Sequence, residues 1–301
     1  MSQYMRSIKD VRQLPLLARG GQAEIYAFTE GKVLRVPNRP QDFDRIRYEY
    51  RVYALLAETT AFVPTVYELL EIEAVPIIVM ERLDGQSMMN QVKTRPWVAR
   101  RKAVELARLH HNLLNVRGST ALNSTTMNAR HCILSSQILA DAAKEKVLSI
   151  LDELPQGETL CHGDFHPGNI IHQDDRDYII DWSGASVGDY HSDIAHTYFL
   201  LKVVPRVPGL HPVMHFAQKR IGRAIANTYL DTMQSERHID YRLLSQWILV
   251  KAAERTYYGL PSEKGQLQRF VHACLASSIS GDNEDLPYRL LQSQRMWPKT
   301  D

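Results

Sequence analysis

The chain has 301 residues with a hydrophobic content of 44%, enough for a substantial core, and its length suits one two-lobed catalytic unit or two modest domains. Its formal net charge of +2 at pH 7, without basic blocks interleaved with aromatic residues, argues against a nucleic-acid partner. No apolar run reaches the length of a membrane span, residues 1–10 lack the apolar core of a signal peptide, and three unclustered cysteines favour free thiols in a reducing cytoplasm.

The first predicted elements are two short strands preceded by a pair of glycines. Residues 25–28 and 32–36 have the composition of strands, and the three residues between them predict a compact hairpin turn. Gly20 and Gly21 lie just before the first strand, where they could let backbone N–H groups approach phosphate groups. A plain turn is the alternative for this Gly-Gly pair.

An amphipathic helix is predicted over residues 42–57. Its apolar residues recur at spacings of 4, 3 and 4 from Ile46 onward, and Glu49 falls within the same stripe. A carboxylate that faces the body of a domain needs a partner, and Arg35 in the preceding strand is the candidate. The alternative is that Glu49 lies at the edge of the stripe and reaches solvent.

The next segments are a strand, a helix and a loop. Residues 76–80 form a short apolar strand that ends in a polar turn. Apolar residues at helical spacing across 103–114 include His110, whose place on an apolar face favours a hydrogen-bonded core residue over a ligand. Residues 115–130, rich in Asn, Ser and Thr without a clear period, predict a surface loop.

The segment of residues 161–193 is the most informative part of the chain. Glycine and proline residues break regular structure on both sides of Asp164, which predicts a loop there. Two short strands follow at residues 170–171 and 178–180, joined by a polar turn.

This arrangement suits the transfer of a phosphoryl group with magnesium. If the two strands pair antiparallel, Asn169 before the first and Asp181 after the second lie at the same end of the hairpin. The loop brings Asp164 to that end as well. Asn169 and Asp181 offer the hard oxygen ligands that Mg²⁺ prefers, and Asp164 is free to accept a proton from an attacking hydroxyl. The alternative is a loop whose polar side chains only cap turns.

The rest of the chain is predicted to be mostly helical. Amphipathic helices cover roughly residues 216–233 and 243–257, and a third shows a one-sided apolar stripe across 267–275.

The central segment resembles the aminoglycoside phosphotransferase and choline kinase-like families, which are small-molecule kinases with the protein-kinase fold. The family loop H-G-D-x-H-x-x-N stands here as residues 162–169, the I-D-W segment as 180–182, and the later G-D-x-x-x-D-x-A as 188–195. The resemblance implies an α+β fold of two lobes. Residues 1–82 would form a nucleotide-binding lobe with an antiparallel sheet and one helix, and 83–301 a mostly helical lobe with the catalytic loop and acceptor site.

The resemblance also implies a role for each matching residue in the transfer of a nucleotide γ-phosphate to a hydroxyl of a small molecule. Asp164 would be the catalytic base, Asn169 and Asp181 would hold Mg²⁺, and His162 and Asp193 would support the loop. Arg35, where protein kinases carry a lysine, would pair with nucleotide phosphates. The residues implied to bind ATP or GTP are Gly20, Gly21, Arg35, Glu49, Glu81 and Leu83, and those implied to contact the acceptor are Glu254, Tyr257 and Tyr258.

Three other functions compete with a cytoplasmic small-molecule kinase. A protein kinase of the same fold is disfavoured because only eleven residues separate Asp181 from Asp193, too few for a long activation loop. A non-catalytic nucleotide-binding module would usually have a broken motif, and here the motif is intact. A zinc hydrolase is disfavoured because Gly163 and Pro167 oppose the helix that a zincin histidine pair needs.

The acceptor is the part of the function that the sequence leaves open. Many relatives carry an acidic residue after I-D-W, where this chain has Ser183, which removes one charge that could attract an amine. The choice between ATP and GTP, the oligomeric state, and a role in antibiotic resistance or in metabolism stay open as well.

Overall fold

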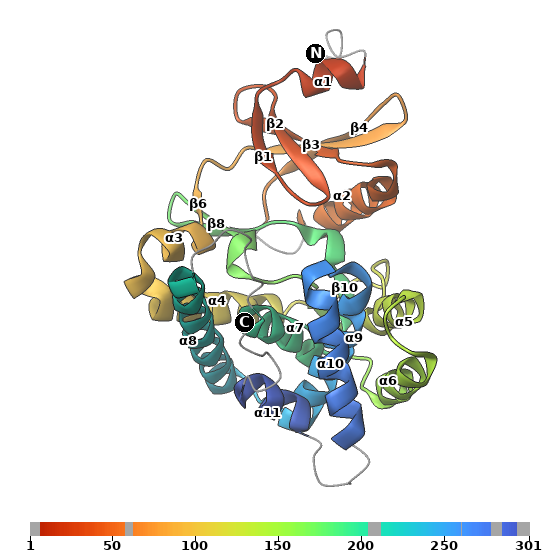
Figure 1. Cartoon of the computed structure of the whole chain (residues 1–301). Coiled ribbons are helices and arrows are strands. Elements are labelled where there is room, and N and C mark those ends of the chain that lie inside the picture. Colours follow the sequence, from red (N-terminus) through yellow and green to blue (C-terminus); the bar gives the residue numbers. More distant parts are fainter. Residues whose placement is uncertain (1–6, 58–62, 204–211, 260, 278–284, 294–301) are drawn as a thin grey trace. The chain divides into compact units, whose positions relative to one another are not determined.

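The computed structural model describes residues 7–57, 63–203, 212–259, 261–277 and 285–293 (Figure 1). The expectation of no signal peptide concerns residues 1–10, most of which lie outside this part. The chain divides into two compact units, a first unit of residues 1–91 and 167–185 and a second unit of residues 92–166 and 186–301. An antiparallel sheet early in the chain and a helical later part confirm the predicted α+β class, while the functions assigned to residues 1–82 and 83–301 stay predictions.

The first unit is built on a five-stranded antiparallel sheet with the strand order β1-β2-β3-β5-β4. A single long helix, α2, follows β3, as predicted, and a five-residue helix that was not predicted, α1, precedes the sheet. The bounds are α1 Ile8–Arg12, β1 Leu16–Arg19, β2 Ala23–Ala27, β3 Lys32–Pro37, α2 Phe43–Ala57, β4 Val66–Ile72 and β5 Val75–Glu81.

Strand alternation in β3 separates the apolar core of the sheet from its charged residue. Leu34 and Val36 point to one face, where they join a buried cluster with Tyr26 and with Val11 of α1. Arg35 points to the opposite face and contacts α2.

A second, three-stranded sheet in the first unit carries the predicted hairpin. The strand β8 (Ile170–Gln173) pairs antiparallel with β9 (Arg176–Ile179), and β6 (Gln86–Ser87) adds to β8. Asp174 and Asp175 in the turn both have positive φ, 50° and 59°, as a two-residue type I′ turn requires. The predicted strand pair is therefore confirmed.

The second unit consists of helices around a two-stranded antiparallel ladder of β7 and β10. The three helices predicted in the C-terminal part and the helix around His110 are all present. The bounds are α3 Met88–Thr94 (which begins in the first unit), α4 Ala99–Leu113, α5 Thr125–Ser135, α6 Asp141–Glu153, β7 Thr159–Cys161, β10 Ser186–Gly188, α7 Tyr190–Lys202, α8 Pro212–Glu236, α9 Tyr241–Tyr258, α10 Pro261–Ser277 and α11 Leu286–Ser293.

The prediction of a loop across residues 115–130 is wrong from Thr125 onward, where α5 begins. Thr125, Ala129 and Ile133 are buried at helical spacing, and the hydroxyl of Thr125 hydrogen bonds with that of Ser186 in β10 (2.8 Å). The helix therefore depends on a narrow buried stripe within an otherwise polar sequence.

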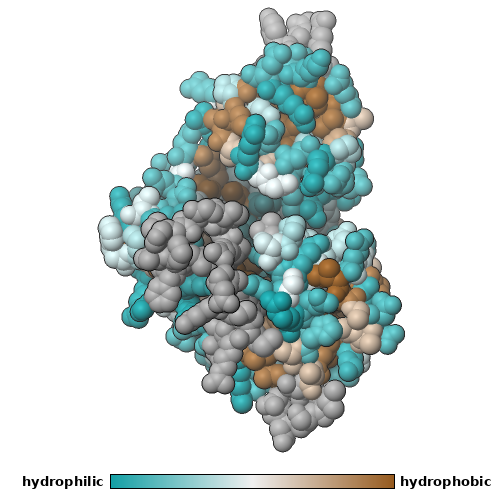
Figure 2. All heavy atoms as spheres, in the orientation of Figure 1, coloured by the Kyte–Doolittle hydropathy of each residue, from teal (hydrophilic) through white to brown (hydrophobic). Residues whose placement is uncertain are grey.

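The surface of the described residues in Figure 2 is mainly hydrophilic, with apolar residues in scattered patches. None of the helices in the described ranges combines the length and the apolarity that crossing a bilayer requires. Cys132, Cys161 and Cys274 are free thiols, as predicted.

Candidate active site

The turn between β1 and β2 contains the two glycines that were predicted to approach phosphates. The N–H of Gly20 donates to the carbonyl of Ala23 (2.9 Å), and the side-chain amide of Asn38 donates to the carbonyl of Gly20 (3.0 Å). A Cβ at Gly20 would lie 3.1 Å from the Ala23 carbonyl oxygen, whereas one at Gly21 would meet nothing within 4 Å. The turn is tightly closed at Gly20 and presents exposed backbone at Gly21.

Arg35 links two carboxylates on the face of β3 that contacts α2. Its Nε donates to Oε2 of Glu49 (2.8 Å), and its Nη2 donates to Oδ1 of Asp181 (2.9 Å). Glu49 is fully buried, which confirms the predicted ion pair and excludes the solvent-facing alternative. The contact between Arg35 and Asp181 was not predicted. We call Arg35, Glu49 and Asp181 the charged trio.

The charged trio has two carboxylates for one guanidinium. Burial raises the pKa of Glu49 to about 7, because the lowering effect of the Arg35 charge is smaller and Asp181 adds a further repulsion. Burial alone would lower the pKa of Arg35, but the two carboxylates together raise it above its usual value. Arg35 is thus a permanent cation, and Glu49 is a carboxyl group that is easily protonated.

Asp181 and Asn169 flank the β8–β9 hairpin at the same end, as predicted. The N–H of Ile180 donates to the backbone carbonyl of Asn169 (3.0 Å), directly continuing the ladder. Asp181 has φ 64° and ψ 65°, a left-handed conformation that aspartate tolerates better than most residues. Its N–H donates to the hydroxyl of Tyr53 in α2 (3.3 Å). The backbone that presents the Asp181 carboxylate is therefore held by the helix that carries Glu49.

The donor chemistry of Asn169 and Asp181 fits Mg²⁺. Both side chains supply hard oxygen atoms, and protein Mg²⁺ sites often use one or two such ligands together with phosphate oxygens and water. Within the described ranges, no group of three or more His, Cys, Asp or Glu residues is placed to hold a metal ion.

The segment predicted to contact the nucleotide base follows β5. The N–H of Glu81 donates to the carbonyl of Thr65 (2.8 Å), and the N–H of Arg82 donates to the carbonyl of Gly31 (2.9 Å). Both groups are thus occupied within the first unit, and Leu83 is the next residue along the chain.

Asp164 lies in the second unit, in the loop after β7. Its side chain is 43% exposed, and Nε2 of His166 lies 3.6 Å from its Oδ2. Burial tends to raise the pKa of Asp164, but the neighbouring histidines, His166 foremost, together outweigh it and hold the pKa below the usual value. Asp164 is therefore an accessible carboxylate. Because Asn169 and Asp181 belong to the first unit, the predicted convergence of all three stays a prediction.

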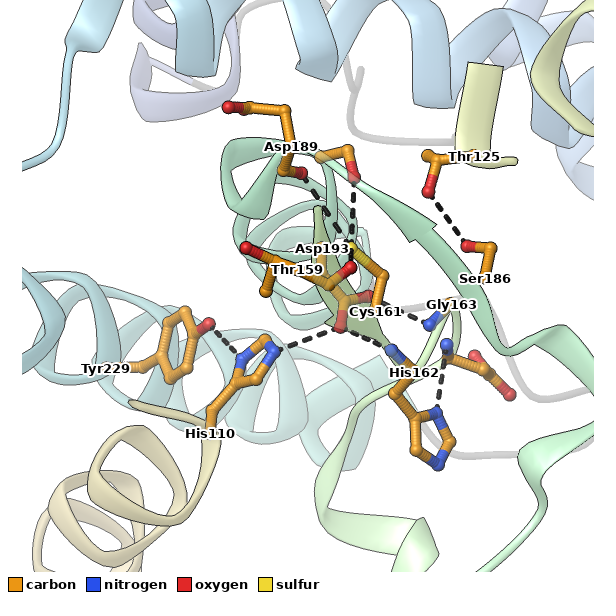
Figure 3. A network of polar contacts seen from close by, with 12 residues as sticks. His110, Thr125, Thr159, Cys161, His162, Gly163, Ser186, Asp189, Asp193 and Tyr229 are labelled. Atoms are coloured by element: carbon orange, nitrogen blue, oxygen red, sulfur yellow. Dashed lines mark hydrogen bonds and ion pairs between the residues drawn. The ribbon is translucent and has the colours of Figure 1, made fainter. Parts of the chain in front are cut away.

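Asp193, in α7, anchors the loop that carries Asp164 (Figure 3). Its two oxygens accept hydrogen bonds from the backbone N–H groups of His162 (2.7 Å) and Gly163 (2.9 Å), and Nε2 of His110 lies 3.2 Å from Oδ2. Burial would raise the pKa of Asp193, but these contacts lower it far below the usual value. Within the loop, the N–H of Asp164 donates to Nδ1 of His162 (3.2 Å).

The residues predicted to contact the acceptor lie at the end of α9. Glu254 is buried, and its Oε2 accepts a hydrogen bond from Nζ of Lys251 (2.9 Å). Burial alone would lower the pKa of Lys251, but Glu254 raises it above the usual value. Tyr257 and Tyr258 are both exposed, and Tyr257 meets the ring of His131 edge-on. Glu254 is therefore part of an ion pair, and the two tyrosines are accessible.

The sequence reasoning missed Lys251, Tyr53 and Tyr229 as neighbours of the proposed site. Lys251 precedes Glu254 by three residues in a predicted helix, so this ion pair could have been found from spacing alone. The contacts of Tyr53 with Asp181 and of Tyr229 with His110 join residues 128 and 119 positions apart, and no local pattern indicates them.

The sequence profile of the phosphotransferase enzyme family matches residues 14–229. This match spans most of the chain, so the protein belongs to the phosphotransferase enzyme family. No curated protein sequence matches the chain.

Solved structures of small-molecule kinases share the fold at low sequence identity. An aminoglycoside-3′-phosphotransferase of type VIII aligns with a TM-score of 0.56 and 19% identity, covering 80% of this chain and 93% of the other. The streptomycin–ATP complex of APH(2″)-IIa aligns with a TM-score of 0.52 and 17% identity, covering 90% and 93%. A choline/ethanolamine kinase family protein from Mesorhizobium loti aligns with a TM-score of 0.51 and 16% identity, covering 97% and 89%. These similarities show a protein-kinase-like fold.

Proposed function

We propose that this protein is a cytoplasmic kinase that uses Mg²⁺ and transfers the γ-phosphate of ATP or GTP to a hydroxyl of a small molecule. The observation that carries this proposal is the accessible carboxylate of Asp164, whose pKa is lowered and whose loop is anchored by Asp193. Membership of a phosphotransferase family, and the ATP in one structural neighbour, support the same reaction class.

The first unit supplies the nucleotide site in this proposal. The exposed backbone at Gly21 approaches the phosphates, and Arg35, oriented by Glu49, neutralises their charge. Since the N–H groups of Glu81 and Arg82 already donate to carbonyls of the first unit, we assign the base contact to the N–H of Leu83. Asn169 and Asp181 hold Mg²⁺, which supplies positive charge to the phosphate oxygens.

Asp164 orients the acceptor hydroxyl and takes its proton. The acceptor oxygen forms a bond with the γ-phosphorus while the bond from that phosphorus to the bridging oxygen breaks, which leaves a nucleoside diphosphate. A carboxylate with a lowered pKa is a weak base, which is compatible with the loose transition state of phosphoryl transfer.

The acidic residues near the loop do not offer free charge for a cationic acceptor. Asp189 caps α7 by accepting from the N–H of His191, Asp193 binds the loop backbone, and Glu254 pairs with Lys251. Together with Ser183 in the position that is often acidic in relatives, this favours an acceptor recognised through its hydroxyl groups over one recognised through several amines.

The test is nucleotide turnover with Mg²⁺ against pooled aminoglycosides, macrolides, amino alcohols, sugars and hydroxy amino acids. We expect one pool to stimulate turnover, and Asp164→Asn to lower that turnover by about 10²- to 10⁴-fold while nucleotide affinity stays unchanged. Asp141→Asn, at an exposed carboxylate of α6, is the matched control and should keep full activity. Unchanged turnover in Asp164→Asn would refute the base assignment, and tight nucleotide binding without transfer to any pool would favour a non-catalytic module.

A further inference from the structure

His110, in α4, makes three side-chain contacts, and two of them lead to the loop that carries Asp164. The ring is fully buried, Nδ1 lies 2.6 Å from the hydroxyl of Tyr229, and Nε2 lies 3.2 Å from Oδ2 of Asp193 (Figure 3). The ring also stacks on Phe165, with centroids 4.1 Å apart and planes inclined by 21°. His110 is therefore more than a hydrogen-bonded core residue, because two of its contacts, Asp193 and Phe165, lead to the loop.

These contacts reach the loop on both sides of Asp164. Asp193 binds the N–H groups of His162 and Gly163, which immediately precede Asp164. Phe165 immediately follows Asp164 and is also fully buried. A shift of the His110 ring would therefore move both neighbours of the proposed base.

Asp193 and Tyr229, at the two ends of this chain of hydrogen bonds, determine which nitrogen of His110 donates and which accepts. The low pKa of Asp193 keeps it an acceptor, so Nε2 of His110 must carry the proton between them. Burial raises the pKa of Tyr229 well above its usual value, so its hydroxyl keeps a proton to donate to Nδ1. The hydroxyl thereby selects the His110 tautomer that can bind Asp193.

We propose that Tyr229 and His110 are positioning residues for Asp164, acting through Asp193 and through the stacked ring of Phe165. The expected effect on catalysis rests on the proposed function, whereas the expected effect on the backbone of the Asp164 loop does not. Tyr229 contributes by fixing the tautomer and the orientation of the His110 ring, and neither residue touches the reacting atoms.

The first measurement is hydrogen exchange at the backbone amides of His162 and Gly163, compared between Tyr229→Phe and Tyr198→Phe. Both changes remove one buried hydroxyl in the second unit, but Tyr198 lies outside the contacts of His110. Tyr229→Phe should speed exchange at these two amides severalfold, and Tyr198→Phe should leave them unchanged. Equal rates in both variants would overturn the proposal, and this readout does not depend on any enzymatic activity.

The second measurement separates kcat from KM in the same pair of variants. Tyr229→Phe should lower kcat by about two- to tenfold, the range that corresponds to the net loss of one hydrogen bond, while KM for the nucleotide stays constant. His110→Phe keeps an aromatic ring next to Phe165 but loses both hydrogen bonds, so it should lower kcat further than Tyr229→Phe.

The two measurements also distinguish failure of this inference from failure of the proposed function. Absence of transfer by the wild type to any acceptor would refute the kinase, while faster exchange in Tyr229→Phe would still support the positioning of the loop. A changed nucleotide KM with unchanged kcat, or kcat values equal in Tyr229→Phe and Tyr198→Phe, would overturn the positioning role.

Discussion

Glu49 in the first unit and Asp193 in the second are carboxylates that are equally shielded from water, with exposures of 0% and 1%, yet their proton affinities are shifted in opposite directions. Burial raises the pKa of Glu49 to about 7, whereas the contacts of Asp193 hold its pKa far below the usual value. The difference lies in the donors. Glu49 shares one guanidinium with Asp181 and has one backbone donor, Trp182, while Asp193 receives two backbone N–H groups and the ring of His110.

Burial therefore sets the cost of a charge, and the number of donors decides whether the charge is kept. Asp193 is a fixed anion that holds a loop in place. Glu49 is an adjustable group whose charge depends on what its neighbours carry. The adjustable carboxyl group of Glu49 is compatible with a site that must bind a changing set of phosphate charges, as we propose for the first unit. The fixed anion of Asp193 is compatible with a loop that must hold a base still, as we propose for Asp164.

Removal of Asp193, the carboxylate with more hydrogen-bond donors, should have the largest effect on stability. Asp193→Ala removes the acceptor of the buried N–H of His162 and of the part-buried N–H of Gly163, and it leaves the buried His110 without its carboxylate partner, so we expect the free energy of unfolding to fall by about 3–5 kcal/mol. Urea unfolding followed by circular dichroism measures this loss.

Asp152→Ala, at an exposed carboxylate of α6, is the control and should change the unfolding free energy by less than about 0.5 kcal/mol. A comparable loss in both variants would mean that the donors of Asp193 do not distinguish it from a surface charge.

The raised pKa of Glu49 should make the free energy of unfolding depend on pH. Because the pKa of Glu49 is raised in the folded state, its contribution favours folding below the unfolded-state pKa near 4.5 and is lost as the pH rises through about 7. Unfolding free energies measured from pH 4.5 to 8 should fall more steeply for the wild type than for Glu49→Gln, by up to about 3 kcal/mol over the window.

Asp193 does not interfere in that window, since a lowered pKa gives a contribution that is lost only at more acidic pH. Parallel pH profiles for the wild type and Glu49→Gln would show that the guanidinium of Arg35 satisfies Glu49 fully, and the contrast with Asp193 would disappear.

The smallest predicted effect comes from a substitution in the first unit that leaves the hydrogen-bond donors of Glu49 and Asp193 unchanged. Ala74, exposed in the turn between β4 and β5, has φ 62°, a conformation that glycine adopts at no steric cost. Ala74→Gly should raise the free energy of unfolding by about 0.5 kcal/mol, whereas Ala142→Gly, at an exposed position of helix α6, should lower it by about 1 kcal/mol.

Both glycine variants should keep the wild-type pH profile, because they leave the charged trio intact. An altered profile in Ala74→Gly would show that the pH dependence follows overall stability and not the Glu49 carboxyl. Stabilities that change in the same direction in the two variants would contradict the role assigned to positive φ.

Local periodicity was enough to predict much of this fold and part of the site. The helical spacing around Glu49 placed it opposite Arg35, and the two short strands after Asn169 predicted the hairpin. Periodicity failed at α5, where a polar sequence hides the buried stripe that begins at Thr125.

Contacts between distant positions were the other failure. Arg35 and Asp181 are 146 positions apart, and His110 and Tyr229 are 119 apart, so each pair depends on the packing of elements that no single segment encodes. A sequence pattern can name the residues that do chemistry, but the residues that hold them in place emerge only from the folded structure.

Arg35 also determines how this protein reacts with covalent probes. Reagents that acylate an amine, or condense with it, need a neutral nitrogen nucleophile, and a guanidinium retains its proton throughout the pH range in which proteins are handled. Nucleotide analogues designed to label the lysine of protein kinases would therefore leave Arg35 unmodified. The neighbouring Lys32, whose Nζ lies 4.1 Å from the ring centroid of Tyr67, points to the other face of β3, so any label found there would report that face and not the face that carries Arg35.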